Sequence, residues 1–446
     1  MEQQHMFTNR MIRNLLVPVV LEQILNSIMG TADTMMVSNV GSAALSAVSL
    51  VDSINILLIQ AFSALAAGGA IVCAQYIGQK NYEKANMSAR QVLFIITAIS
   101  VAVSAACLIF QKPLLRLIFG AVEADVMHAS ETYFFYTALS FPFIASYDAA
   151  ASIFRAQENT KGPMIISMIS NIMNIGGNAI LIWVFHLGVA GAAISTLVSR
   201  IFCAVVVLYQ LRKDRQPIVV RDYLKIRPDW SMIGRILGLG IPSGIENSMF
   251  QLGKLAIQST VSTLGTAAIA AQAMTNILEN LNGIAAIGVG VGLMTIVGQC
   301  LGAGRKDEAV YYIKKLCVIA EIVITVSCLI VYAVARPVTI LGGMEKSSAA
   351  MCIHMITWIT IVKPLVWTMA FVPGYGLRAA GDVKFSMITS CCTMWACRFC
   401  LCVFLIRVLG FGPMGVWIGM FADWTVRGII FTWRFHSRRW LEHKVI

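Results

Sequence analysis

Long apolar stretches recur along nearly the whole chain, and this pattern limits the possible folds more than any other feature. The stretch Gly162–Ser199 has no formally charged side chain and is long enough for two membrane spans of about 20 residues each. Lipid offers backbone groups no hydrogen-bond partner, so each apolar run should form a continuous helix. We therefore expect an all-α integral membrane protein with twelve transmembrane helices. The expected spans cover residues 13–37, 44–77, 89–111, 128–154, 163–185, 189–211, 234–262, 268–300, 312–334, 350–377, 385–406 and 413–433.

The composition agrees with a membrane protein. Of the 446 residues, 58% are hydrophobic and 13% are charged, whereas soluble domains contain about 25% charged residues. The mean hydropathy of +0.76 leaves too little polar surface to cover a soluble body of this size. These values exclude a cytosolic enzyme.

Lysine and arginine are concentrated in alternate loops between the expected spans. The positive-inside rule places the lysine-rich and arginine-rich loops in the cytoplasm. We therefore expect a multi-pass protein of the cell (plasma or inner) membrane with both termini in the cytoplasm. The net charge of +12 is then a topology signal, and no nucleic-acid partner is expected. The opposite loops hold only Lys112, Arg116, Arg336, Lys346 and Arg407.

The two halves of the sequence match in one nearly constant register, in which Pro18 is aligned with Pro242. This register predicts two pseudo-symmetric six-helix lobes, 1–211 and 234–446, joined by a cytoplasmic linker at 212–233. Because six is even, both copies enter the membrane from the same side, and a binding cavity is expected between them. Two such lobes suit a transporter that works by alternating access. Other matching positions include Glu22 and Glu246, Gly68 and Gly292, and Gln75 and Gln299.

Five short motifs are each weak signals alone but are specific when they occur together in one chain. They are Gly30-Thr31-Ala32-Asp33 after Pro18, Gln75–Gly78, Phe154–Lys161, Gly188–Thr196 and Leu377–Asp382. With these motifs the sequence resembles the multidrug and toxic compound extrusion (MATE) transporter family over nearly its whole length. The resemblance implies efflux of amphipathic, often cationic compounds, coupled to the antiport of H⁺ or Na⁺. It implies no cofactor other than this transported ion.

Polar side chains inside the expected spans are candidates for function, because ionisable groups are unfavourable in a bilayer. Their spacing places those of the first span on one helix face and those of the fifth span on another. The first face carries Glu22, Asn26, Gly30 and Asp33, and the second carries Asn171, Asn174 and Asn178.

The resemblance implies a cation site in the N-terminal lobe. Asp33, Asn174 and Thr196 match the family's pattern, and Ala192 falls where a backbone oxygen is supplied. Carboxylate, amide and hydroxyl oxygens suit Na⁺, and the carboxylate alone could carry a proton. Asn178 departs from the pattern, because many relatives have a second acid there. Interhelical hydrogen bonding is an alternative role for the asparagines.

The C-terminal lobe has no copy of this site, since the register of the repeat aligns Asp33 with Ile257 and Asn178 with Cys402. It has other intramembrane polar groups instead. Lys254 and Glu279 could meet across the lobe, as a structural bridge or as a substrate-binding pair, and Arg398 and Asp423 should form a structural pair. The full set of substrate or cavity candidates is Glu22, Asn26, Asn171, Glu246, Gln251, Lys254, Asn276, Glu279 and Lys363.

Two rival functions remain open at this stage. A flippase for lipids or lipid-linked oligosaccharides would have a related two-lobed fold. An intramembrane enzyme would need a catalytic or metal-binding constellation, but the histidines are scattered. The sequence has no Walker-type phosphate-binding loop, which disfavours export driven by ATP. Cys397 and Cys400 have no second pair nearby, so no metal is expected beyond a possible Na⁺. The expected partners are the bilayer, organic cations or drugs and the coupling ion, and we expect a monomer.

Overall fold

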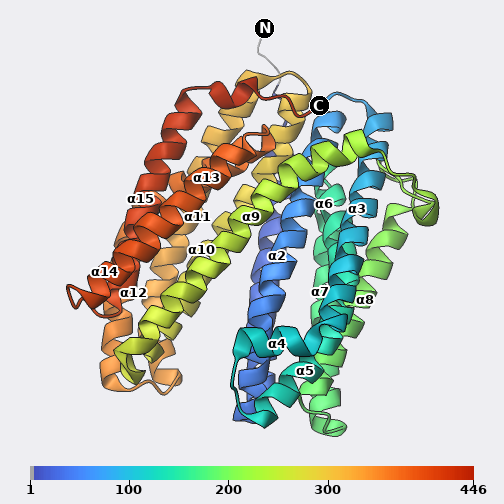
Figure 1. Cartoon of the computed structure of the whole chain (residues 1–446). Helices are drawn as coiled ribbons and strands as arrows, with labels where there is room; N and C mark the ends of the chain where they lie inside the picture. Colours follow the sequence, from blue (N-terminus) through green and yellow to red (C-terminus); the bar gives the residue numbers. More distant parts are fainter. Residues whose placement is uncertain (1–4) are drawn as a thin grey trace. The chain divides into compact units, whose positions relative to one another are not determined.

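The computed structural model describes residues 5–446, which form helices and contain no β-strand (Figure 1). The α-helices are α1 (Asn9–Ser38), α2 (Ser42–Gly78), α3 (Tyr82–Ile109), α4 (Gln111–Phe119), α5 (Ala124–Leu139), α6 (Phe141–Ala156), α7 (Lys161–Asn178), α8 (Val189–Leu211), α9 (Trp230–Val261), α10 (Thr266–Gly302), α11 (Lys306–Leu341), α12 (Lys346–Ala379), α13 (Val383–Thr393), α14 (Leu401–Arg407) and α15 (Met414–His436). The π-helices are η1 (Ala179–Val184) and η4 (Met394–Cys400), and the 3-10 turns are η2 (Tyr223–Lys225), η3 (Ser262–Leu264) and η5 (Arg439–Glu442).

The helices confirm the all-α membrane fold, and each expected span has a counterpart. Within residues 5–446, nine helical segments are long and apolar enough to cross a membrane by themselves. The other three spans correspond to α9, α15 and the pair α5–α6. The expected span 128–154 is divided because α5 ends at Leu139 and Pro142, which has no backbone N–H, lies in the first turn of α6.

Two equivalent spans of the repeat contain a π-helix. In the first half, η1 continues α7 after Asn178, and in the second half, η4 separates α13 from α14. Short π-helical segments inside α-helices are frequent at functional sites. Because a π-helix occurs in both copies of the repeat, the side chains around these two segments are candidates for function.

The chain divides into two compact units. Unit 1 comprises Met1–Gln23 and Ile245–Val445, and unit 2 comprises Ile24–Gly244 and Ile446. The predicted lobes and these units differ in two segments, because the first part of α1 belongs to unit 1 and the first part of α9 belongs to unit 2. Both divisions fall just after the equivalent prolines Pro18 and Pro242.

Close helix packing inside each unit explains this exchange. In unit 2, a Cβ added to Gly68 of α2 would lie 2.7 Å from the backbone nitrogen of Gly240 on α9. In unit 1, a Cβ added to Gly292 of α10 would lie 2.3 Å from the side chain of Leu16 on α1. The two contacts join equivalent positions of the repeat, so the same packing occurs in both copies. Glycine at these positions lets the helix backbones approach closely.

Unit 2 is organised around α2, which packs against α3, α5 and α6. Helix α8 packs against α5, α6 and α7. The remaining part of α1, from Ile24 to Ser38, completes this unit. It faces α7 through the polar contacts described below.

Unit 1 has a hydrophobic core in two parts. Helices α10, α11 and α12 pack against one another, and α15 packs against α12. One buried cluster contains Ala286, Trp367 and Trp424, and the other contains Leu278, Ile359 and Trp417. Along α10, α12 and α15, polar residues lie between the members of the two clusters. These are Glu279, Asn282, Lys363 and Asp423.

Candidate functional site

The candidate cation site lies inside unit 2, where α1, α7 and α8 bring four predicted residues together. The Nδ2 of Asn178 donates a 2.6 Å hydrogen bond to Asp33 Oδ1. With its amide nitrogen turned toward the carboxylate, Asn174 donates to Asp33 Oδ1 at 2.6 Å and Oδ2 at 3.1 Å. The amide oxygen of Asn174 then lies 3.3 Å from Thr196 Oγ1. The structure therefore brings together Asp33, Asn174, Asn178 and Thr196, which the family resemblance had placed in one cation site.

Backbone oxygens and a hydroxyl complete this site on the α8 side. Thr196 Oγ1 donates to the carbonyl of Ala192 at 3.0 Å, the backbone oxygen expected from the family resemblance. Ser195, which the sequence did not single out, donates to the carbonyl of Asn174 at 2.9 Å. A Cβ added to Gly177 would lie 2.4 Å from Ser195 Oγ, so glycine is required for this close approach of α7 and α8.

One acceptor in the site has no partner. The Oδ1 of Asn178 is buried and has no hydrogen bond within the described part of the chain. Asn178 and Asn174 are 1% and 6% exposed. A buried polar atom without a partner is unfavourable by about 1–3 kcal/mol. The site therefore has a free oxygen beside a carboxylate, which is suited to a cation.

A second polar contact joins α1 and α7 two turns away. Asn26 Oδ1 accepts hydrogen bonds from Ser167 Oγ at 2.8 Å and from Asn171 Nδ2 at 3.1 Å. Asn26 and Asn171 were predicted as cavity candidates, and the structure brings them together. Glu22, the remaining candidate of α1, is buried and belongs to unit 1.

The sequence analysis missed an acid and an arginine in unit 2. Asp52 on α2 accepts hydrogen bonds from Tyr133 at 3.1 Å and from Asn55 at 3.2 Å. Arg200 on α8 donates to Ser140 Oγ at 2.7 Å, and its charge acts on both Asp33 and Asp52. Both residues lie inside expected spans, so the rule that flagged Asp33 would also have found them.

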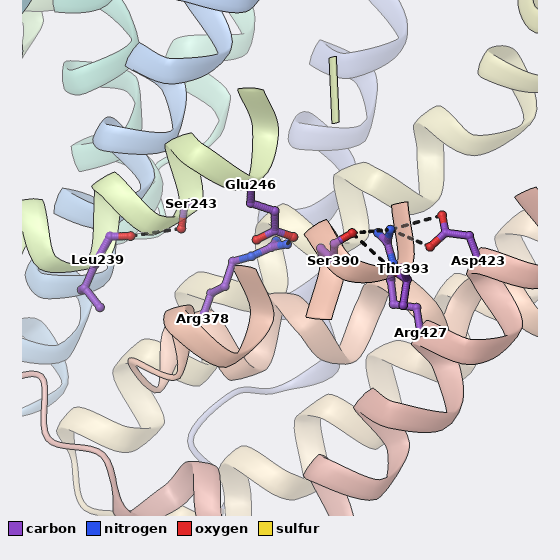
Figure 2. A network of polar contacts seen from close by, with 8 residues as sticks. All are labelled: Leu239, Ser243, Glu246, Arg378, Ser390, Thr393, Asp423 and Arg427. Carbon is purple, nitrogen blue, oxygen red and sulfur yellow. Dashed lines mark hydrogen bonds and ion pairs between the residues drawn. The ribbon is translucent and has the colours of Figure 1, made fainter. Parts of the chain in front are cut away.

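Unit 1 holds the predicted polar residues of the second half. Glu246 on α9 forms an ion pair of 2.7 Å with Arg378 on α12, and Figure 2 shows the two side chains pointing toward each other. Asn276 accepts a 3.3 Å hydrogen bond from Gln272 on the same helix. Gln251 lies on α9 three residues before Lys254.

The possible ion pair between Lys254 and Glu279 is not formed, although the charge of Lys254 acts on Glu279. Glu279 instead forms an ion pair with Lys363, which also contacts Asn282. The reason is that α10 and α12 pack directly against each other, so Lys363 reaches the carboxylate. The ammonium of Lys254 lies 5.2 Å from the centre of the Phe250 ring.

The predicted structural pair Arg398 and Asp423 is confirmed as a contact, with a distance of 2.7 Å. A third residue, Arg427, contacts the same carboxylate at 2.8 Å. Figure 2 shows Arg427 between Asp423 and the helix that carries Ser390 and Thr393. It donates to Thr393 Oγ1 at 3.3 Å and to the carbonyl of Ser390 at 3.4 Å, which ties α15 to α13.

Comparison with known proteins identifies the family. The MatE family profile matches residues 18–180 and again residues 242–404. The chain belongs to the MATE transporter family. The two matches begin and end at equivalent positions of the two halves, which supports the internal repeat. Members of this family are membrane transporters, so the MATE chain is a multi-pass membrane protein of the multidrug efflux family.

Two curated relatives are similar over nearly their full lengths. The probable multidrug resistance protein YoeA of Bacillus subtilis is 25% identical over 439 residues, which cover 96% of this chain and 94% of the relative. The probable multidrug resistance protein NorM of Thermotoga maritima is 24% identical, with 97% and 93% covered. A solved multidrug resistance MATE transporter in an outward-facing conformation has the same fold, with a TM-score of 0.89, 19% identity and coverage of 96% and 95%.

Proposed function

We propose that this MATE protein exports amphipathic, often cationic compounds in exchange for H⁺ or Na⁺ by alternating access. The geometry around Asp33 carries the proposal. The carboxylate accepts hydrogen bonds from the amides of Asn178 and Asn174, Asn174 in turn contacts the Thr196 hydroxyl, and the buried amide oxygen of Asn178 has no partner in the described part of the chain. An ionisable group is unfavourable in a bilayer, so its presence inside a membrane-spanning unit indicates a functional role.

Each coupling ion has a physical rationale at this site. Na⁺ is a hard cation, and the oxygens of Asp33, Asn178, Thr196 and Ala192 are hard ligands of the kind it prefers. A proton on Asp33 would be donated to an acceptor, and Asn178 Oδ1 is an acceptor without a partner. In either case, the ion neutralises the carboxylate and removes the reason for the amide groups to hold α7 against α1.

The same proposal includes the cellular setting. We infer a cell-membrane protein with both termini in the cytoplasm, because lysine and arginine concentrate in the loops on that side. We also infer a monomer, since a single chain already contains both of the lobes that alternating access requires.

Efflux from proteoliposomes tests the proposal. The purified protein would be reconstituted into liposomes that are loaded with the fluorescent cation rhodamine 123. A sodium gradient, a proton gradient, both or neither would then be imposed across the liposome membrane. We expect efflux to require one of the gradients, and the effective gradient identifies the coupling ion. Equal efflux without any gradient would contradict the antiport mechanism.

A further inference from the structure

One group of charged residues in unit 1 contains more cations than carboxylates. We use the name interior charge cluster for six residues from five helical segments. The four cations are Lys254, Lys363, Arg398 and Arg427, and the two carboxylates are Glu279 and Asp423. Charged groups inside a membrane protein normally pair with one another, so this imbalance needs an explanation.

The two carboxylates are already engaged by three of the cations. Asp423 is shared by Arg398 at 2.7 Å and Arg427 at 2.8 Å, and all three side chains are almost fully buried. Glu279 is paired with Lys363, whose ammonium is also buried. Within the described residues, Lys254 has neither an ion pair nor a hydrogen-bond partner. Arg398 and Arg427 have one carboxylate between them.

Lys254 and Arg398 gather around a single aromatic ring. The ammonium of Lys254 lies 5.2 Å from the ring centre of Phe250, and the guanidinium carbon of Arg398 lies 4.6 Å from the same point. The charges of Arg398 and Glu279 both act on Lys254, so its ammonium lies near these two side chains. The Lys254 side chain is nevertheless exposed. A bound molecule can therefore reach its ammonium.

Buried nitrogen donors in this region lack acceptors. The Nε of Arg398 has no partner within residues 5–446, although its side chain is only 3% exposed. The same holds for Nδ2 of Asn282 and Nε1 of Trp424, both of which adjoin Lys363. A buried donor without an acceptor is unfavourable. The region is therefore short of both negative charge and hydrogen-bond acceptors.

The other acids of unit 1, including the buried Glu22 and Asp382, are not among the charges that act on Lys254 or Arg398. Glu246 is neutralised by Arg378. Glu321 on α11 accepts from Thr325, and it is not among the charges that act on Lys254 or Arg398. The shortage around Phe250 is therefore a property of the site as it is built.

We propose that unit 1 binds an oxyanion, such as a carboxylate or sulfonate group of the transported compound, between Lys254 and Arg398. Arg398 Nε and the ammonium of Lys254 donate to its oxygens, and the Phe250 ring packs beside the apolar part of the same molecule. This inference rests on the proposed export function and narrows its substrates. Compounds that carry an anionic group in addition to an aromatic or cationic body are expected to bind best.

Two related dyes test the proposal. Rhodamine 110 has a free carboxylate, and rhodamine 123 is its methyl ester, so the pair differs at the group in question. Binding of each dye to the full-length protein in detergent would be measured by fluorescence anisotropy without any ion gradient. We expect the wild type to bind rhodamine 110 about tenfold more tightly, which corresponds to one charge-assisted hydrogen bond.

Substitutions at Lys254 locate the site. Lys254→Gln should abolish the preference for rhodamine 110 while rhodamine 123 still binds, and Lys254→Arg should keep it. Lys314→Gln, which removes an exposed lysine at the start of α11, is the matched control and should behave as the wild type. Equal affinity of the wild type for both dyes, or an unchanged preference in Lys254→Gln, overturns the proposal. Because binding needs no gradient, failure of the antiport mechanism would appear only in the efflux assay.

Discussion

Asn178 donates a 2.6 Å hydrogen bond to the carboxylate of Asp33, and this contact joins α7 to α1 inside unit 2. Two turns earlier on both helices, Asn171 contacts Asn26 in the same manner. Both contacts thus repeat at a spacing of seven residues along each helix. The helix pair is held by polar groups, and one of them, Asp33, can change its charge or bind an ion. This combination is suited to a joint that opens and closes during transport.

Asp33→Asn should abolish gradient-driven efflux of rhodamine 123 and leave expression intact. The amide has nearly the same shape as the carboxylate, but it can neither carry a proton nor neutralise Na⁺. Efflux from proteoliposomes should fall to the level of liposomes without protein. Asp125→Asn, which changes an exposed acid at the start of α5, is the control and should transport normally. Efflux at the wild-type rate in Asp33→Asn would refute the assignment of this residue.

Asn178→Asp should strengthen sodium binding. It places a second carboxylate beside Asp33, and additional negative ligand charge tightens the binding of hard cations. We expect an affinity for Na⁺ about tenfold higher than that of the wild type, seen as a larger rise in unfolding temperature with NaCl than with choline chloride. Asn171→Asp is the control, because Asn171 contacts Asn26 and not Asp33. An identical response to both salts in Asn178→Asp would show that no cation binds there.

The periodicity of the sequence grouped the polar residues of α1 and those of α7, because each set lies on a single helix face, while the family resemblance linked the two sets to Thr196. A spacing of three or four residues groups Asn171, Asn174 and Asn178 whatever the helix packs against. Ser195 could not be found by this argument, since its role depends on how α8 approaches α7. A close approach made possible by a glycine such as Gly177 leaves no periodic signal.

The structure of unit 1 shows a second limit of sequence patterns. The repeat predicted two copies of six helices, but it did not reveal that parts of α1 and α9 pack in the opposite unit from the rest of their lobe. Apolar stretches report that a helix is in the membrane, and not which neighbour it contacts. For the same reason, the sequence allowed an ion pair between Glu279 and Lys254, whereas the packing of α10 against α12 makes Lys363 the ion-pair partner of Glu279.

Asp423→Asn should destabilise the protein strongly. Its carboxylate is the ion-pair partner of the buried Arg398 and Arg427. Removing one partner of a buried ion pair typically lowers the free energy of unfolding by about 3–5 kcal/mol. Thermal unfolding in detergent should therefore shift to a markedly lower temperature. Asp307→Asn breaks an exposed pair with Arg438 and should have little effect; comparable shifts in the two variants would contradict the structural role of Asp423.

Lys363→Met should leave Glu279 as a charged group without its ion-pair partner. Lys363 is fully buried and lies between the two hydrophobic clusters, so methionine can occupy the apolar part of its space. We expect a loss of about 3–5 kcal/mol in the free energy of unfolding. Adding Glu279→Gln should recover much of the lost free energy of unfolding, because the double variant no longer buries an unpaired charge. Losses that simply add in the double variant would show that the two residues do not interact.

Gly68→Ala should weaken the packing of α2 against α9 in unit 2. Its new Cβ would lie 2.7 Å from the backbone nitrogen and 2.9 Å from the Cα of Gly240. Backbone atoms cannot relieve such a clash by a change of rotamer, as a flexible side chain can. Overpacking of this kind usually lowers the free energy of unfolding by about 1–3 kcal/mol. Gly234→Ala is the matched control, since nothing lies within 4 Å of the Cβ that would be added on α9. Gly292 occupies the equivalent position in the other copy of the repeat. A Cβ added there would contact the side chains of Leu15 and Leu16, which can move, so Gly292→Ala should destabilise the protein less than Gly68→Ala. Equal unfolding temperatures for Gly68→Ala and Gly234→Ala would contradict the close helix contact.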